Sequence, residues 1–302
     1  MKMTKEQAQK AREFLIHQAR PLEAALYAYE FENGSREKVV EELNTFQNED
    51  GGFGHGLEPD FRLSDSSPLA TTVAFQVMSR ISLDASHPMV EKGIRYFLQT
   101  YDEQKGCWMA VPEKVNDYPH APWWHVSEEK NEGDWGNPTA EIIGYLHEYA
   151  ELVPREFLEE LTGRALDTLL SYPDKMDMHE ILCFDRMAVR LADPPKETVY
   201  EKLKRCIPQV IGKSEKDWEE YSATPLTFID SPKSPYLEVV DNSLIEKNLD
   251  YLINKQEDKG NWAPNWDWFG NYEEDWPKAR DEWKGILTLN NLRILREFKR
   301  MR

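Results

Sequence analysis

The sequence predicts an all-α protein built from repeated helix pairs, and three observations support this fold class. First, a pattern of Gln, three residues, Gly, one residue and an aromatic residue occurs at Gln47–Phe53 and Gln256–Trp262, and Asp102–Trp108 repeats the spacing with Asp in place of Gln. Second, each copy ends an apolar helical stretch. Third, no segment shows the alternation of a half-buried strand. A pattern that recurs at wide intervals indicates a repeat architecture.

The repeated unit extends beyond this pattern on both sides. A Leu lies four residues before the Gln or Asp of each copy, at Leu43, Leu98 and Leu252. Pro68 and Pro277 each follow their aromatic residue by 15 positions, whereas Pro138 follows Trp108 by 30. Ser67 and Asn137 place a capping side chain before a Pro at the first helical position. The unit is therefore a helix, a Gly-aromatic turn, a long loop and a helix that starts at Pro.

Helical spacing of apolar residues predicts the remaining elements in order. The predicted helices are 5–18, 21–31, 36–47, 67–82, 88–101, 138–151, 154–171, 176–192, 196–212, 243–256 and 278–299. We interpret these helices as pairs, each with an outer and an inner member. The inner member of the fifth pair would then lie in the irregular stretch 213–241, where three Pro residues prevent one continuous helix.

Three long loops, 48–66, 102–137 and 257–277, each join an outer helix to the next inner helix. We expect them to emerge on one face and to close over a site. Long ordered loops on a rigid scaffold commonly carry function.

This repeat resembles the QW motif of the terpenoid cyclase and protein prenyltransferase superfamily, the prenyltransferase and squalene oxidase repeat. The residues that carry the resemblance are Leu43, Gln47, Gly51 and Phe53, then Lys92, Gly93, Phe97, Leu98, Asp102, Gly106 and Trp108, and finally Tyr251, Leu252, Gln256, Gly260 and Trp262. The resemblance implies a single-domain (α/α)6 toroid over residues 1–302, with inner helices around a central cavity. In that superfamily the motif is structural and carries no chemistry.

Composition excludes several classes of partner. The formal net charge of −18 argues against nucleic acid and anionic membrane surfaces, which require clusters of Lys and Arg. Cys107, Cys183 and Cys206 are few, odd in number and far apart, so no disulfide framework is expected. No apolar signal segment and no run long enough to span a membrane is evident. We expect a cytoplasmic protein with a small-molecule ligand, and the sequence leaves its oligomeric state undetermined.

The first long loop gathers four titratable residues, namely His55, Glu58, Asp60 and Asp65. One interpretation is a general acid or base in a cleft, with Asp65 close to the start of an inner helix. The alternative is structural: Asp65 with Ser66 or Ser67 caps that helix, and His55 and Arg62 pair with the carboxylates.

Nine of the ten Trp residues lie in the second and third loops or just beyond them. Such large side chains rarely occur in numbers in surface loops. A wall of aromatic rings can bind the face of a sugar, a cation or an apolar polyene. The alternative is a lid with a small core of its own. The residues predicted to bind substrate are His55, Trp123, Trp124, Trp135, Trp266, Trp268 and Trp283.

Two acids on inner helices complete the predicted catalytic set of Asp65, Glu58, Glu141 and Asp185. Glu141 lies one turn into an apolar helix, where it could also complement the helix dipole. His179 and Cys183 share a helix face, but no second ligand pair is evident, so we expect neither a metal nor a cofactor. Cys183 is predicted to lie in the core, and Asp185 is predicted to pair with Arg186 or a neighbour.

The resemblance implies terpenoid or prenyl chemistry, yet the catalytic motifs of that superfamily are missing. The stretch that would carry the zinc-binding Asp-x-Cys reads Asp65-Ser66-Ser67, and neither Asp-x-Asp-Asp nor Asp-Asp-x-x-Asp occurs. Acidic loops also disfavour a diphosphate. The first hypothesis is a toroid that binds or converts an isoprenoid-like apolar ligand in its cavity. The alternatives are a carbohydrate-processing (α/α)6 enzyme with paired carboxylates, drawn from the acids above, and a non-catalytic binding scaffold.

Overall fold

The computed structural model describes residues 1–127 and 135–302, and this part of the chain is helical with isolated β-bridges in place of strands. The α-helices are α1 (Lys5–His17), α2 (Pro21–Phe31), α3 (Arg36–Asn44), α4 (Pro68–Arg80), α5 (Pro88–Thr100), α6 (Gly136–Glu148), α7 (Arg155–Ser171), α8 (Met178–Ala188), α9 (Pro195–Val210), α10 (Glu215–Glu219), α11 (Pro225–Phe228), α12 (Asn242–Asn254) and α13 (Trp276–Glu297). The all-α prediction is confirmed.

The chain forms two compact units, each of which is described by itself. The terminal unit consists of Met1–Leu43 and Val210–Arg302, and the central unit consists of Asn44–Gln209. The single toroid domain expected from the sequence stays a prediction. Within the described residues, no helix combines the length and the apolar character needed to cross a membrane.

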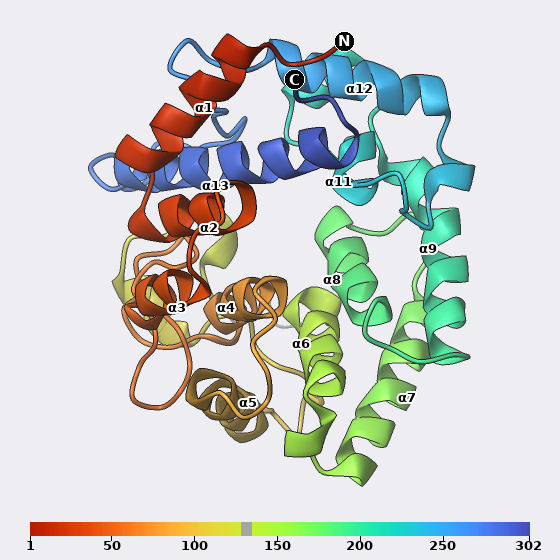
Figure 1. Ribbon diagram of the computed structural model, residues 1–302. Coiled ribbons are helices and arrows are strands. Elements are labelled where there is room, and N and C mark those ends of the chain that lie inside the picture. The colour runs from red at the N-terminus through yellow and green to blue at the C-terminus, as the bar shows by residue number, and fades with distance from the viewer. Residues whose placement is uncertain (128–134) are drawn as a thin grey trace. The chain divides into compact units, whose positions relative to one another are not determined.

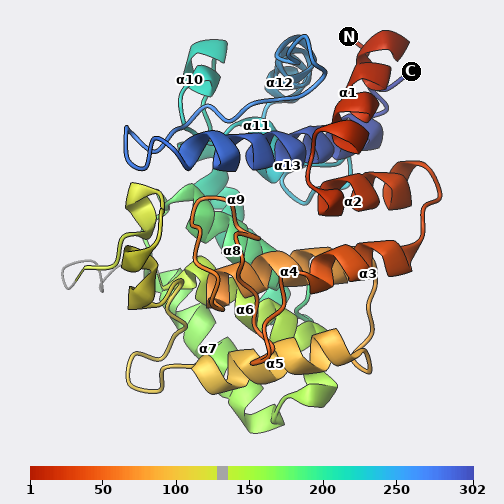
Figure 2. The same ribbon diagram turned by 90° about the vertical axis from the view of Figure 1, so that its left-hand side faces the viewer.

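In the central unit, α6 contacts α4, α7 and α8, and α4 also contacts α5 (Figures 1 and 2). Phe75 of α4 holds this core together, because its ring meets Phe97 and Tyr145 at centroid distances of 5.1 Å and Tyr149 at 5.7 Å. Gly93 of α5 makes room for it, since a Cβ there would lie 2.6 Å from the Phe75 ring. Each such buried ring contributes about 1.5–3 kcal/mol of hydrophobic stabilisation.

In the terminal unit, segments from the two ends of the chain pack together. Helix α1 contacts α2 and α13, α13 contacts α2, and α11 contacts α12 (Figure 1). The Met3 N–H donates to the Arg300 carbonyl at 2.8 Å. Glu30 of α2 accepts from the guanidinium of Arg293 on α13, and both side chains are largely buried. A buried ion pair of this kind is costly to break, so it fixes α2 against α13.

The three repeats share one local geometry. Their glycines have positive φ angles, +92° at Gly51, +68° at Gly106 and +93° at Gly260, which side chains rarely tolerate. The N–H of the aromatic residue two positions later donates to a threonine hydroxyl on the next Pro-started helix in every copy. The pairs are Phe53 with Thr71 at 3.0 Å, Trp108 with Thr139 at 3.0 Å and Trp262 with Thr288 at 3.1 Å.

The glutamine of the first and third copies ties the turn to another helix. The Gln47 amide donates to its own Gly51 carbonyl at 3.0 Å and to the Met89 carbonyl of α5 at 3.2 Å. The Gln256 amide donates to Gly260 at 2.9 Å and to the Gln7 carbonyl of α1 at 3.0 Å. Helices α5 and α1 therefore lie against their turns in equivalent ways, each within its own unit.

The glycines of these two copies lie close to the same helices. A Cβ on Gly51 would come within 2.4 Å of the Lys92 carbonyl oxygen, and one on Gly260 within 2.4 Å of the Lys10 carbonyl oxygen. Lys92 follows Met89 by three positions, as Lys10 follows Gln7, so the two contacts are also equivalent in register.

The middle copy departs from this arrangement because Asp is shorter than Gln. The Asp102 carboxylate accepts from the N–H groups of Gln104 and Lys105 at 2.9 and 3.0 Å, so it stabilises its own turn. Gly106 lies beneath the guanidinium of Arg164 on α7, where a Cβ would overlap the side chain. The turn is preserved, but its contact with α7 is made by the Arg164 side chain and not by the helix backbone.

Two helix starts differ from each other in a way the sequence does not show. At α4 the predicted cap is confirmed, because the Ser67 hydroxyl accepts from the Ala70 N–H at 3.1 Å. At α6 the carboxylate of Glu180, on α8, accepts from the N–H groups of Gly136 and Asn137 at 3.1 and 3.0 Å. A carboxylate at this end also complements the helix dipole. The stretch 213–241 holds two short helices, α10 and α11, so an inner helix of the fifth pair stays a prediction.

We expect Gly260→Ala to destabilise the protein more than Gly270→Ala. Both glycines have positive φ, so each alanine incurs about 1–2 kcal/mol of backbone strain. A Cβ at Gly270 meets nothing within 4 Å, whereas one at Gly260 meets the α1 backbone and adds about 1–3 kcal/mol of overpacking. Chemical denaturation measures both free energies of unfolding. Equal losses would mean that the turn does not pack on α1.

Candidate functional site

The first two long loops join in the central unit through a short antiparallel contact. The Arg62 N–H donates to the Pro119 carbonyl at 2.8 Å, and the Ala121 N–H donates to the Asp60 carbonyl at 2.7 Å. We call residues 54–62 and 118–126 the joined loops. The expectation that loops 48–66 and 102–137 meet is confirmed here, although part of the second loop lies outside the described residues. The third loop belongs to the terminal unit, so a meeting of all three stays a prediction.

Two carboxylates of the joined loops are buried. The side chain of Glu58 is 8% exposed and that of Asp60 is 4% exposed, and a Glu58 oxygen accepts from the Asp60 N–H at 3.3 Å. The Arg62 guanidinium lies over Gly56, where a Cβ would come within 2.9 Å of it. Burial of carboxylates is expensive, so acids buried in irregular loops are typical of functional sites.

Two histidines of the joined loops form a hydrogen-bonded chain. The Nδ1 atom of buried His120 lies 2.6 Å from the Tyr118 carbonyl oxygen, which only accepts, so Nδ1 carries the proton. In the neutral form of His120, Nε2 is then an acceptor for the Nδ1–H of His125, 3.2 Å away. Because His125 is exposed, this chain of imidazoles connects the interior of the joined loops to the protein surface.

Aromatic rings cover one side of this contact. Phe61 and His120 are directly opposite each other in the antiparallel pair, so their side chains lie on the same side. Trp124 meets the Phe61 ring edge-on at a centroid distance of 6.0 Å. Its indole Nε1 is buried and has no hydrogen-bond partner among the described residues, while Trp123 is exposed. The joined loops therefore combine acids, imidazoles, aromatic rings and an unused donor.

Two predicted residues of the first loop have other surroundings. Asp65 is half-exposed and forms an ion pair with Lys114, so the structural alternative holds in part, with Ser67 as the cap of α4. His55 is exposed at a φ of +54°, and its Nε2 atom lies 2.8 Å from the Asn48 side-chain oxygen.

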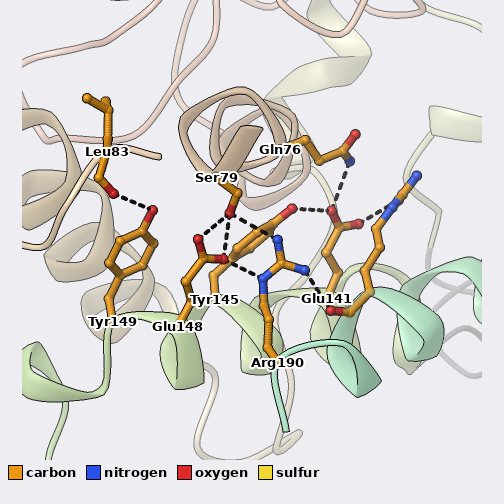
Figure 3. Close-up of polar contacts among 9 residues, drawn as sticks. Gln76, Ser79, Leu83, Glu141, Tyr145, Glu148, Tyr149 and Arg190 are labelled. Carbon is orange, nitrogen blue, oxygen red and sulfur yellow. Dashed lines mark hydrogen bonds and ion pairs between the residues drawn. The ribbon is translucent and has the colours of Figure 1, made fainter. Parts of the chain in front are cut away.

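Glu141 is the buried centre of a polar network on three helices (Figure 3). Its carboxylate accepts from Gln76 of α4 at 2.9 Å, from the Tyr145 hydroxyl at 2.8 Å and from Arg186 of α8 at 2.8 Å. The side chain of Glu141 is only 2% exposed. Its oxygens are thus occupied by three donors, which favours a structural anchor over a general acid or base.

The same network continues toward solvent. Arg190, just after the end of α8, pairs with Glu148, donates to the Ser79 hydroxyl at 3.0 Å and lies 4.4 Å above the Tyr145 ring. Figure 3 shows these groups in one row beside Glu141. Burial, followed by the Glu141 carboxylate, raises the pKa of Tyr145 well above its usual value. The row of pairs fixes α4, α6 and α8 in one register.

Arg186 pairs with Glu141, and the expected pairing of Asp185 with Arg186 or a neighbour stays a prediction. Burial first, and then the Asp185 carboxylate, raises the pKa of Tyr200 on α9 to about 12. Cys183 lies in the core as predicted. Across the part of the chain that the structure describes, no group of three or more His, Cys, Asp or Glu side chains could hold a metal ion.

The other four tryptophans that were predicted to bind substrate fall into two groups. Trp135 and Trp268 are structural: the Trp135 indole donates to the Gly106 carbonyl at 3.0 Å, and the buried Trp268 ring packs on Trp276 at 5.6 Å. Trp266 and Trp283, both in the terminal unit, contact each other at 5.1 Å with their planes at 79°. The indole N–H groups of this second pair have no partner among the described residues.

Comparison with known proteins adds no family. No family model matches the chain, and no curated protein does.

Sequence reasoning placed His120 and His125 in a Trp-rich loop but did not assign them a function. The available signal was the segment His-Ala-Pro-Trp-Trp-His, in which two titratable rings flank two large aromatic rings. The hydrogen bond between the two imidazoles depends on the Tyr118 carbonyl and on the contact with the first loop, and no sequence pattern predicts either of these.

We expect Glu141→Gln to lower the free energy of unfolding by about 2–4 kcal/mol, because the change leaves the guanidinium of Arg186 without its counter-charge. Asp65→Asn is the control, since its half-exposed ion pair is screened by water and its loss should not shift the unfolding midpoint measurably. Adding Arg186→Met to Glu141→Gln should recover part of the loss. Strictly additive effects in this double-mutant cycle would contradict the pairing.

The native thiols are expected to react slowly with a thiol reagent near pH 8. Burial is the main cause that raises the pKa of all three cysteines, to about 11 for Cys206, so roughly one Cys206 thiol in a thousand is ionised at that pH. Half-buried Cys107 should react first, and all three should react at once in denaturant. A fast reaction at Cys183 in the native protein would contradict its burial.

Proposed function

We propose that this chain is an α/α toroid of the terpenoid cyclase and prenyltransferase type. The support is local and is repeated in both units. The turn of the first copy packs on α5 and the turn of the third copy packs on α1, through matching Gln and Gly contacts. A repeat near the end of the chain that uses the first helix as its neighbour is what a closed ring of helix pairs requires.

We further propose that the joined loops are the active site of an enzyme that uses carboxylates. The observation that carries this proposal is the burial of Glu58 and Asp60 in an irregular loop that contacts buried His120. Rigid helices position both loops, so the acids keep one geometry. Glu58 and Asp60 are the proposed general acid and base, and the His120–His125 chain moves protons between the site and solvent.

The composition of the joined loops supports a hydroxyl-rich substrate, and so favours the carbohydrate alternative over an isoprenoid. An isoprenoid presents mainly apolar carbon, which offers no hydrogen-bond partner to buried acids and imidazoles. A sugar ring presents hydroxyls to such groups and an apolar face to rings such as Trp123 and Trp124. Paired carboxylates are also the usual requirement for cleavage of a glycosidic bond, where one carboxylic acid protonates the leaving oxygen.

A ligand screen tests the proposal. The purified protein is titrated with oligosaccharides and, separately, with isoprenoid alcohols and diphosphates, and the thermal midpoint and product formation are measured. We expect an oligosaccharide to raise the midpoint and to be converted. Glu58→Gln and Asp60→Asn should each lower the rate by about 10²–10⁴ while retaining binding. Asp65→Asn is the matched control and should keep the rate.

The controls separate function from folding. Circular dichroism and unfolding midpoints of each variant show whether a lost rate follows from lost structure. Full activity of both Glu58→Gln and Asp60→Asn would reject the site. Stabilisation by isoprenoids alone would favour the apolar-ligand hypothesis. If neither oligosaccharides nor isoprenoids stabilise the protein, a scaffold without small-molecule chemistry is favoured.

A further inference from the structure

Two neighbouring tryptophans of the terminal unit each bury a hydrogen-bond donor that is not used. Trp266 lies in the third long loop and Trp283 lies on α13, with ring centroids 5.1 Å apart and planes at 79°. The Nε1 atoms of both are buried and have no acceptor among the described residues. An unsatisfied buried donor costs free energy, so two side by side require an explanation.

Other tryptophans of the protein have indole N–H groups that do find an acceptor. Trp262, in the same loop, donates to the Leu252 carbonyl at 2.8 Å, and Trp218 donates to the Gly212 carbonyl at 2.8 Å. In the central unit, Trp108 donates to the Phe97 carbonyl at 2.7 Å. These three indoles donate to a backbone carbonyl, whereas the indole N–H groups of Trp266 and Trp283 have no acceptor among the described residues.

The surroundings of the pair restrict the chemistry of that acceptor. Residues 265–283 hold six acidic and two basic side chains, so an anionic acceptor would be repelled. The Trp266 ring also meets Tyr221 at 5.4 Å and 64°, and Tyr221 is half-exposed. Three aromatic rings thus meet at steep angles, and one of them, that of Tyr221, reaches solvent. Neutral oxygens on a compact ring with an apolar face satisfy both features.

We propose that Trp266, Trp283 and Tyr221 form a saccharide-binding subsite. The two indole N–H groups donate to hydroxyl or ring oxygens of a neutral sugar, and Tyr221 packs on its apolar face. This assignment shares its ligand class with the proposed function, but it rests on different residues in the other unit. It can therefore hold even if the joined loops prove inactive.

Indole resonances test the subsite directly. In a ¹⁵N-labelled sample each of the ten tryptophans gives one indole N–H signal, and Trp266→Phe and Trp283→Phe assign the two of interest by their loss. Neutral methyl glycosides and short oligosaccharides are the probes, with acetate and tetramethylammonium as charged comparisons. We expect the Trp266 and Trp283 signals to shift with a saccharide and the Trp262 signal to stay in place.

Affinity in the variants gives a second measurement. Each Trp→Phe change keeps an aromatic ring and removes one donor, so the saccharide dissociation constant should rise about threefold to tenfold. Trp108→Phe, in the central unit, removes an indole that donates to a backbone carbonyl and should leave that dissociation constant unchanged. The Glu58→Gln variant should also keep the two indole shifts, which distinguishes failure of the subsite from failure of the proposed active site.

Two results would overturn the subsite. One is the absence of any shift at Trp266 and Trp283 with every saccharide, in a protein whose unlabelled form is folded. The other is a shift produced by acetate or tetramethylammonium but by no sugar, because either would assign a charged ligand to the pair.

Discussion

The rest of this structure depends on the contact between a glycine turn and the backbone of a neighbouring helix. At Gly51 and Gly260 the helix comes so close that a Cβ would lie 2.4 Å from a carbonyl oxygen. The same turn holds its aromatic residue by a hydrogen bond to a threonine of the following Pro-started helix. One short segment thus sets the positions of two helices, and the long loop between them is fixed at both ends.

Fixed ends explain why the joined loops can keep polar groups buried. Phe53 is held by Thr71, and Trp108 is held by Thr139, so the loops that follow them leave the scaffold at defined places. The contact of Phe61 with His120 then orders their middles. A carboxylate such as Asp60 can remain buried only if its surroundings cannot relax away from it.

The helical core serves the same purpose by electrostatic means. Glu141, Arg186 and Arg190 join α4, α6 and α8 through charges that would be expensive to leave unpaired. Glu180 of α8 also holds the start of α6, where the second long loop ends. Glu141, Arg186, Arg190 and Glu148 are thus bound to one another, and they hold α4, α6 and α8 together.

The sequence by itself determined the helices, the repeats and the loops that carry the candidate sites. Helix ranges, the Pro68 start and the three glycine turns follow from local rules of periodicity, capping and backbone conformation, which need no knowledge of distant residues. For the same reason the sequence identified Glu58 in an acidic loop, Trp266 in a Trp-rich loop and Trp283 just beyond that loop.

Only the tertiary structure decided what each of these residues does. Asp65 and Glu141 have similar sequence signals, yet one pairs with a surface lysine and the other anchors three helices. Trp135 and Trp266 are both indoles of the predicted long loops, but only Trp135 donates to a backbone acceptor. Whether a charge or a donor is paired depends on residues that lie tens of positions away in the chain. Burial and pairing are therefore properties of the packed molecule, and no local pattern encodes them.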